Sequence, residues 1–138
     1  MERPVCELRV LLSATIEDTE DVCKQFRERL AGIKETLLFQ AELLLREALT
    51  NAVLHGSHGD RRKRVLCAVR LARGRLVIAV QDEGEGFDWR SRPGQPKRPL
   101  DTCGRGIDIY RRYATRVRFN NKGNAVTLVL RLPPEVQQ

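Results

Sequence analysis

Apolar residues recur every three to four positions in three stretches of the chain, which is the period of an amphipathic helix. In the longest stretch, leucines, alanines and a valine line one face, while polar side chains line the other. The spacing predicts helices over about 18–30, 34–54 and 107–114. Thr15 or Asp18 is suited to cap the first helix, and Gly56 to end the second in a left-handed conformation.

Apolar residues alternate with polar ones in other stretches, which is the period of a β-strand. The alternation predicts five strands, over 6–14, 64–71, 75–81, 116–120 and 125–132. A hairpin turn at Ala72 to Gly74 joins the second and third strands, and a turn at Asn121 to Asn124 joins the last two. Because helical and strand periods alternate along the chain, we expect a domain that mixes helices with a sheet.

The polar face of the longest predicted helix carries side chains that can do chemistry. Glu47, Asn51 and His55 are spaced by four residues, so they project from one face of the helix. A carboxylate can accept a proton or orient a hydroxyl group, and an amide oxygen can ligate a hard cation such as Mg²⁺. An ordinary amphipathic helix has a similar polar face, and a histidine such as His55 more often caps its own helix.

A second candidate segment, DEGEGFD, follows the third predicted strand directly. Asp82 at the strand end could accept a hydrogen bond from an exocyclic amine such as N6 of adenine. Gly84 and Gly86 have no side chains, so a flat ring or a sugar could approach the backbone. An acidic turn that ends a hairpin is the alternative interpretation of this segment.

A third candidate segment, formed by Gly104, Arg105 and Gly106, precedes the last predicted helix. Backbone N–H groups at a helix N-terminus favour anions, and glycines let a phosphate come close. Arg105 could hold a phosphate oxygen in two places. A glycine turn that caps a helix is the alternative. The chain contains neither a Walker-type GxxxxGK[ST] loop nor a GxGxxG dinucleotide motif after a strand.

Length and composition favour one domain, over residues 1–138. The net charge of +7 attracts polyanions, which include nucleotides, nucleic acid and acidic protein surfaces. Positive charge is the only feature of the sequence that favours nucleic acid, so we do not expect direct nucleic-acid binding.

None of the four cysteines has the spacing of a zinc site, and scattered thiols suit a reducing cytoplasm. No apolar run reaches the ~18 residues of a membrane span, so a cytoplasmic location is expected.

The order of the motifs is more specific than any one of them. ExxxN and AxxHG lie on one helix, DxGxGFD follows a strand, and GRG precedes a helix. This order resembles the Bergerat-fold ATP-binding domains of the GHKL superfamily, which gyrase, MutL and histidine kinases share. The segments REALTNAVLHG and GRGIDIYRRYAT further resemble the small anti-sigma-factor serine/threonine kinases of the RsbW/SpoIIAB type. The similarity extends from about Cys6 to Leu132.

This resemblance implies an α+β fold, a two-layer sandwich with helices on one face of a mixed, mostly antiparallel sheet. It also implies ATP and Mg²⁺ as cofactors. Glu47 matches the catalytic carboxylate that activates the attacking hydroxyl, and Asn51 matches the Mg²⁺ ligand within the ATP site. The segment from Asp88 to Cys103 matches the lid over the nucleotide. The other matched ATP-binding positions are Asp82, which reads adenine, Gly84, Gly86, Gly104, Arg105 and Gly106.

The resemblance further implies partners and an activity. It suggests a homodimeric serine/threonine protein kinase that sequesters a sigma factor and phosphorylates a STAS-type anti-anti-sigma partner. The alternative is an ATP-binding regulatory module that holds its partner without phosphorylating it. Glu47 speaks against this alternative, because a pure binder has no need of a carboxylate there. A histidine kinase working alone would need a phospho-accepting histidine on a dimerising helix pair, and only His55 and His58 are present.

Overall fold

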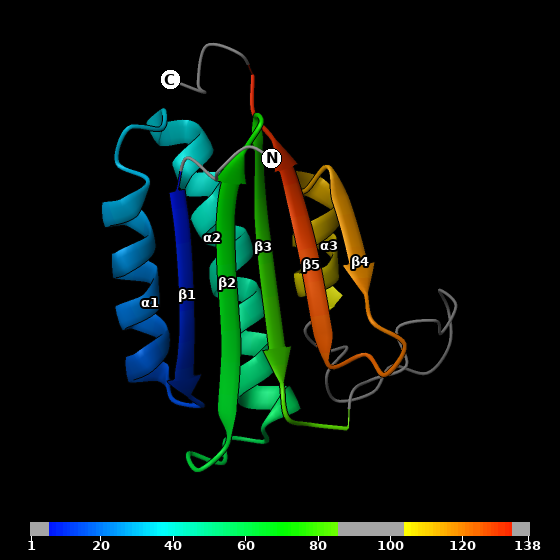
Figure 1. Ribbon diagram of the computed structural model, residues 1–138. Coiled ribbons are helices and arrows are strands. Elements are labelled where there is room, and N and C mark those ends of the chain that lie inside the picture. Colours follow the sequence, from blue (N-terminus) through cyan, green and yellow to red (C-terminus); the bar gives the residue numbers. More distant parts are fainter. Residues whose placement is uncertain (1–5, 86–103, 134–138) are drawn as a thin grey trace.

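A computed structural model describes residues 6–85 and 104–133 of the chain. Its elements form two layers, a five-stranded sheet with the helices packed on one face (Figure 1). The predicted α+β fold is therefore confirmed, and each predicted helix and strand of this part of the chain is present. The elements are β1 (Cys6–Ser13), α1 (Ile16–Arg29), α2 (Glu35–Asn51), η1 (Ala52–Gly56), β2 (Arg64–Ala72), β3 (Arg75–Asp82), α3 (Gly104–Tyr113), β4 (Arg116–Phe119) and β5 (Ala125–Arg131).

The strand order in the sheet is β1-β2-β3-β5-β4, and all four pairings are antiparallel. The central strand β3 pairs with β2 on one side and with β5 on the other. Its last residue, Asp82, faces Val65 of β2 in the register, and Gln81 faces Ala125 of β5. The π-helical turn η1 packs against β3. Asp82 therefore lies in the centre of the sheet, at the end of β3 that is close to η1.

The core lies between the sheet and the helices. Phe26 of α1 and Leu44, Leu45 and Leu49 of α2 are fully buried. Alternate residues of the central strands, such as Ile78, are buried opposite them, as the period of two requires. This packing fixes the rotation of α2 about its own axis. The polar residues of α2 therefore lie on the sides of the helix that do not face the sheet.

At the start of α1, Thr15 is the N-cap, one of the two capping residues that the sequence offered. Its side-chain oxygen accepts a hydrogen bond from the backbone N–H of Asp18 at 3.0 Å. The Asp18 carboxylate accepts a hydrogen bond from the backbone N–H of Ser13, also at 3.0 Å. Both residues that the sequence singled out therefore contribute, since each satisfies a backbone donor at the junction of β1 and α1.

The predicted left-handed cap at Gly56 is wrong. The α2 helix passes at Ala52 into a π-helical turn, η1, and Gly56 lies inside this turn. The backbone N–H of Ser57 donates to the carbonyl oxygen of Ala52 at 2.8 Å, which is the wider spacing of a π-helix. Left-handed conformations occur only afterwards, at His58 (φ 52°) and Gly59 (φ 71°). Gly56 is therefore required for something other than its backbone freedom.

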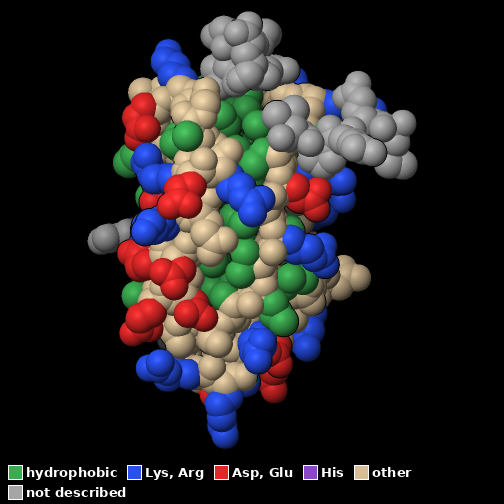
Figure 2. Space-filling model, turned by 60° about the vertical axis from the view of Figure 1, so that its left-hand side comes forward, with side chains coloured by type: hydrophobic (Ala, Val, Ile, Leu, Met, Phe, Trp, Pro, Cys, Tyr) green, Lys and Arg blue, Asp and Glu red, His purple; other side chains and the backbone are tan. Residues whose placement is uncertain are grey.

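Ion pairs connect α1 with α2 on the outside of the helical layer, and acidic and basic side chains stand beside one another on the surface (Figure 2). Glu42 is the centre of this group, because it pairs with both Arg27 and Arg46. Arg27 also pairs with Glu35, and Arg46 with Glu20. Burial raises the pKa of Glu42, but the hydrogen bonds from Arg46 and Arg27 outweigh it and hold the pKa below its usual value.

Replacing Glu42 by glutamine should therefore destabilise the protein in a pH-dependent way. A carboxyl whose pKa is lowered on folding stabilises the fold above its unfolded pKa, and this contribution disappears as the pH falls. We expect a loss of up to about 1 kcal/mol at pH 7, because the arginines are partly exposed. Urea unfolding at pH 7 and about pH 3 measures it, since the unfolded pKa is about 4.3. Glu28→Gln, on the exposed face of α1, is the control, and an equal loss at both pH values would contradict the prediction.

The described part of the chain contains no helix that is both long and apolar enough to cross a membrane.

Candidate functional site

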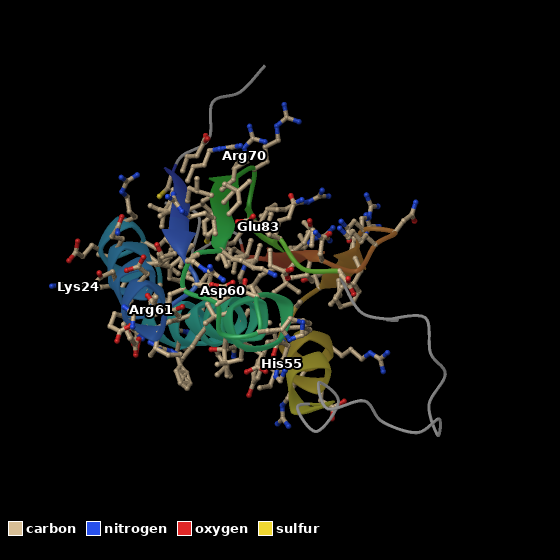
Figure 3. The ribbon with its side chains drawn as sticks, turned by 90° about the horizontal axis from the view of Figure 1, so that it is seen from below. Lys24, His55, Asp60, Arg61, Arg70 and Glu83 are labelled. Atoms are coloured by element: carbon tan, nitrogen blue, oxygen red, sulfur yellow. The ribbon has the colours of Figure 1, made fainter. Side chains whose placement is uncertain are left out.

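The candidate residues gather at one end of the molecule, where α2 and η1 run between the end of β3 and α3. The α2 helix packs against both β3 and α3. In the view from below, His55 of η1 lies on the side of α3, and Glu83, which follows β3, lies on the side of the sheet (Figure 3). One continuous helical segment therefore borders two groups of side chains, one near α3 and one near the end of β3.

Glu47 belongs to the group near α3. Its side chain is half-buried, and burial raises the pKa of its carboxyl group. Within the described residues, no arginine or lysine forms an ion pair with it, in contrast to Glu42 on the same helix. A carboxylate that is partly desolvated and lacks a cation has an increased affinity for protons. This is the environment expected for a carboxylate that accepts a proton during a reaction.

Asn51 lies one turn after Glu47, and its carboxamide contacts α3. The side-chain nitrogen Nδ2 donates a hydrogen bond to the hydroxyl oxygen of Tyr110 at 3.1 Å. Burial raises the pKa of the Tyr110 hydroxyl; the hydrogen bond from Asn51 lowers it, and the charge of Glu47 raises it further. Glu47, Asn51 and Tyr110 therefore form one interacting cluster across the boundary between α2 and α3.

Tyr110 was not predicted from the sequence as a site residue. It is 2% exposed, and its ring lies 6.5 Å from that of Phe119 between centroids. In the sequence it occupies an apolar position of α3, so it was indistinguishable from a core residue. The available signal was its hydroxyl group, because a buried tyrosine hydroxyl usually finds a polar partner.

Asp82 belongs to the second group, at the end of β3. Its carboxyl group is packed between two glycines, and its oxygen Oδ1 accepts a hydrogen bond from the backbone N–H of Gly84 at 2.6 Å. A Cβ atom on Gly56 would lie 2.1 Å from Oδ2 of Asp82, which is an impossible contact. A Cβ atom on Gly84 would lie 2.1 Å from the carbonyl oxygen of Gly56. The two glycines are therefore needed here for close approach.

The environment of Asp82 changes its acidity in two opposing ways. Burial raises the pKa of the carboxyl group, while the hydrogen bond from Gly84 and the positive charges of Lys122 and Lys63 lower it, and burial prevails. An acceptor that is half-buried and held by one backbone donor can recognise an N–H group with little competition from water. This fits the predicted recognition of an exocyclic amine, which stays a prediction.

The backbone of Asp82 is held by a second residue that sequence reasoning missed, Asn124. The Asp82 N–H donates to the Asn124 carbonyl oxygen at 2.9 Å, and the Asn124 side-chain Nδ2 donates to the Asp82 carbonyl oxygen at 2.9 Å. Asn120 shapes this turn, because its side-chain oxygen accepts from the N–H groups of Gly123 and Asn124. The sequence predicted the turn between β4 and β5, but three asparagines in five residues were the only sign of these contacts.

The remaining predicted residues are described in part or not at all. Gly104, Arg105 and Gly106 form the first turn of α3, which begins three residues earlier than predicted. Their backbone N–H groups therefore belong to the N-terminus of a ten-residue helix, as an anion site requires. Gly86 and the predicted lid from Asp88 to Cys103 lie outside the described residues.

The donor set can be tested against Mg²⁺ and ATP. No group of three or more His, Cys, Asp or Glu side chains in the described part of the chain could hold a metal ion by itself. Mg²⁺ bound with a nucleotide does not need such a group, because it takes phosphate oxygens, water and one or two protein ligands. The amide oxygen of Asn51 fits that requirement as a protein ligand. The Asp82 carboxyl group, packed against Gly56 and Gly84, offers a hydrogen-bond acceptor to a ring with an exocyclic amine.

The separation of the two groups also fits a nucleotide. Nine residues of continuous helical backbone join Glu47 to Gly56, which corresponds to roughly 13 Å along the axis. An elongated ligand could therefore contact Asp82 at one end and reach Glu47 at the other. The α3 N-terminus would then be available to its negatively charged part.

Comparisons with known proteins agree with this geometry. The family model described as a histidine kinase-like ATPase domain matches residues 12–130. An anti-sigma F factor from Geobacillus thermodenitrificans (strain NG80-2) is 29% identical over 96 residues, which cover 67% of this chain and 66% of that protein. The solved histidine kinase domain of the blue-light activated histidine kinase from Erythrobacter litoralis EL346 matches with a TM-score of 0.51.

The structural match covers 88% of this chain and 61% of the solved one, at 17% identity, so it shows the fold alone. In both comparisons the chain spans less than two thirds of the matched protein. The family model, by contrast, covers most of the chain and includes Glu47, Asn51 and Asp82. This chain belongs to the family of histidine kinase-like ATPase domains.

Proposed function

We propose that this protein is an ATP-dependent serine/threonine protein kinase and anti-sigma factor. It would sequester a sigma factor and phosphorylate a STAS-type anti-anti-sigma partner. The observation that carries the kinase proposal is the state of Glu47, a half-buried carboxylate with a raised pKa and no cation partner in the described part, one turn before Asn51. The sigma-factor proposal is supported by similarity to an anti-sigma F factor.

Each residue has a proposed task in the reaction. Asp82 accepts a hydrogen bond from the exocyclic amine of adenine, while Gly56 and Gly84 let its carboxyl group take the position that this requires. The N-terminus of α3, with Arg105, binds the phosphates. Asn51 holds Mg²⁺ through its amide oxygen. Bound MgATP supplies the phosphoryl group and reduces the repulsion that an incoming oxygen would meet.

Glu47 performs the proton chemistry in this proposal. It orients the hydroxyl group of the partner's serine or threonine and accepts its proton as the oxygen attacks the γ-phosphorus atom. The bond between the γ-phosphorus and the bridging oxygen breaks, and ADP leaves with that bonding electron pair. The product is a phosphoserine or phosphothreonine on the partner, and the proton passes from Glu47 to solvent.

We also propose residues 1–138 as a single domain, a homodimer and a cytoplasmic location, all of which stay predictions. The net charge of +7 supports an acidic partner surface. Sedimentation of the purified chain, with and without ATP, tests the homodimer. A mass that stays that of one chain at micromolar concentration would contradict it.

The experiment for the kinase activity uses the full chain, [γ-³²P]ATP, Mg²⁺ and purified STAS-domain proteins from the same organism. We expect label on a serine or threonine of one of these proteins. The proposal fails if no serine or threonine is labelled although the chain binds ATP. If ATP then tightens the binding of a sigma factor without formation of ADP, the chain is a regulatory binding module that does not phosphorylate its partner.

A further inference from the structure

We propose that Tyr110 is a positioning residue that determines which end of the Asn51 carboxamide faces the metal ion. The inference rests on the proposed role of Asn51 as a Mg²⁺ ligand, and it adds a residue of this chain to that role. It is carried by the hydrogen bond between Asn51 and Tyr110 and by the burial of Tyr110 against α2.

The problem that Tyr110 solves lies in the chemistry of a carboxamide. Its oxygen can ligate a cation, but its NH₂ group cannot, and both ends have nearly the same shape. The terminal torsion of asparagine is broad and roughly two-fold, so the side chain alone does not choose between the two orientations. A half-buried asparagine that ligates Mg²⁺ therefore needs a neighbour that distinguishes oxygen from nitrogen.

Tyr110 provides such a neighbour. Its hydroxyl oxygen accepts the hydrogen bond from Nδ2 of Asn51 at 3.1 Å, so Oδ1 lies at the opposite end of the carboxamide. In the described part of the chain no residue donates a hydrogen bond to that oxygen. The oxygen is thus left available for a cation, and the nitrogen is turned away from it.

The tyrosine is itself held rigidly. It is 2% exposed, and its ring packs against Phe119 of β4. It also lies on α3, the helix whose first turn contains the predicted phosphate-binding residues Gly104 to Gly106. One hydrogen bond therefore connects the proposed metal ligand on α2 with the proposed phosphate-binding helix. The orientation of Asn51 depends on α3 being in place.

The test is the substitution Tyr110→Phe, which removes the hydroxyl group and keeps the ring. The affinity for a fluorescent ATP analogue is measured by titration in EDTA and in a Mg²⁺ series, and the ratio of the two affinities gives the gain due to Mg²⁺. We expect Mg²⁺ to increase the affinity of wild type. In Tyr110→Phe this increase should be roughly 10-fold smaller, as for other residues that orient a metal ligand. Affinity in EDTA should change little.

Tyr113→Phe is the matched control, because Tyr113 lies on the same helix, is half-buried and contacts Arg112 in place of Asn51. It should behave as wild type. A second background, Asn51→Asp, makes both ends of the side chain oxygen atoms, so that no orientation is needed. In this background Tyr110→Phe should have no further effect on the gain due to Mg²⁺. The substitution can also lower the midpoint temperature of unfolding, so binding is measured below that temperature.

The outcomes separate the inference from the function on which it rests. If Tyr110→Phe keeps the full gain due to Mg²⁺, the positioning role is wrong while the proposed Mg²⁺ site remains. The role is also wrong if the substitution lowers the gain equally in the Asn51→Asp background, because the loss then has nothing to do with orientation. A wild-type chain that binds ATP without any gain from Mg²⁺ would overturn both proposals together.

Discussion

Replacing Glu47 by glutamine is expected to slow phosphoryl transfer by about 10²–10⁴-fold, the usual contribution of a general base. Glutamine has nearly the same shape but cannot accept the proton of the attacking hydroxyl. ATP should still bind, since Asp82 and the α3 N-terminus are unchanged. Single-turnover transfer from [γ-³²P]ATP to the partner and titration of ATP binding measure the two effects separately. Glu42→Gln, an equal change on the same helix, is the control and should stay within a few-fold of wild type.

The pH dependence of the wild-type rate should follow from the raised pKa of Glu47. Because burial favours the protonated carboxyl, the base becomes inactive at a higher pH than an exposed glutamate, whose pKa is about 4.3. The transfer rate should therefore fall on the acidic side with an apparent pKa above this value. A rate that is independent of pH down to 4.3, or a Glu47→Gln variant with the wild-type rate, would exclude Glu47 as the base.

The substitution Glu47→Gln should leave the fold intact or stabilise it. The folded pKa of Glu47 lies above its unfolded pKa, so the folded state binds the proton more strongly. Stability then decreases as the pH rises through the interval between the two values, and the whole penalty is present above the folded pKa. Glutamine removes this penalty at neutral pH and changes little below the unfolded pKa. A loss of activity with an unchanged or higher unfolding midpoint cannot arise from misfolding.

The pKa shifts of Glu47 and Glu42 have opposite signs, although both residues lie on α2. Glu42 is held by two arginines, so its ionised form is favoured and contributes to stability. Glu47 is kept away from cations in the described part, and the fold loses stability by burying it. Such a local loss is common at functional sites, where activity and stability compete. The contrast supports a chemical role for Glu47 and a structural one for Glu42.

The order of helices and strands was predictable because it depends on local periodicity. The apolar spacing in α2 also predicted that Glu47 and Asn51 share a face, since a separation of four residues guarantees it in any α-helix. Asp82 was found because a strand end is visible in the alternation of β3. These predictions need no knowledge of tertiary contacts, which explains why the structure agrees with them.

The contacts between distant segments could not be predicted in the same way. Tyr110 meets Asn51 across 59 residues, and Asn124 holds Asp82 across 42. No local pattern encodes such pairs, because only the packing of α3 on α2 and of β5 on β3 brings them together. Gly56 shows the same limitation. A glycine at a helix end usually indicates a left-handed cap, but this one faces the carboxyl group of Asp82.

The substitution Gly56→Ala is expected to weaken ATP binding at least about 10-fold and to destabilise the fold by about 1–3 kcal/mol, as overpacking does. The added methyl group would lie 2.1 Å from Oδ2 of Asp82, so the carboxyl group must move away from the position proposed to read adenine. Gly56 does not have a positive φ, so alanine fits its backbone and the effect isolates the steric clash. Isothermal titration with ATP and urea unfolding measure the two effects.

Gly32→Ala is the matched control for this prediction, because a Cβ atom there meets nothing within 4 Å. It should change neither ATP affinity nor stability by more than about 0.5 kcal/mol. Combining Gly56→Ala with Asp82→Ala should cost less binding than the sum of the two single changes, since both act through the same carboxyl group. If Gly56→Ala binds ATP as tightly as wild type, the Asp82 carboxyl does not need its observed position to recognise the nucleotide. If the two substitutions add fully, Gly56 contributes to ATP binding by a route that does not involve Asp82.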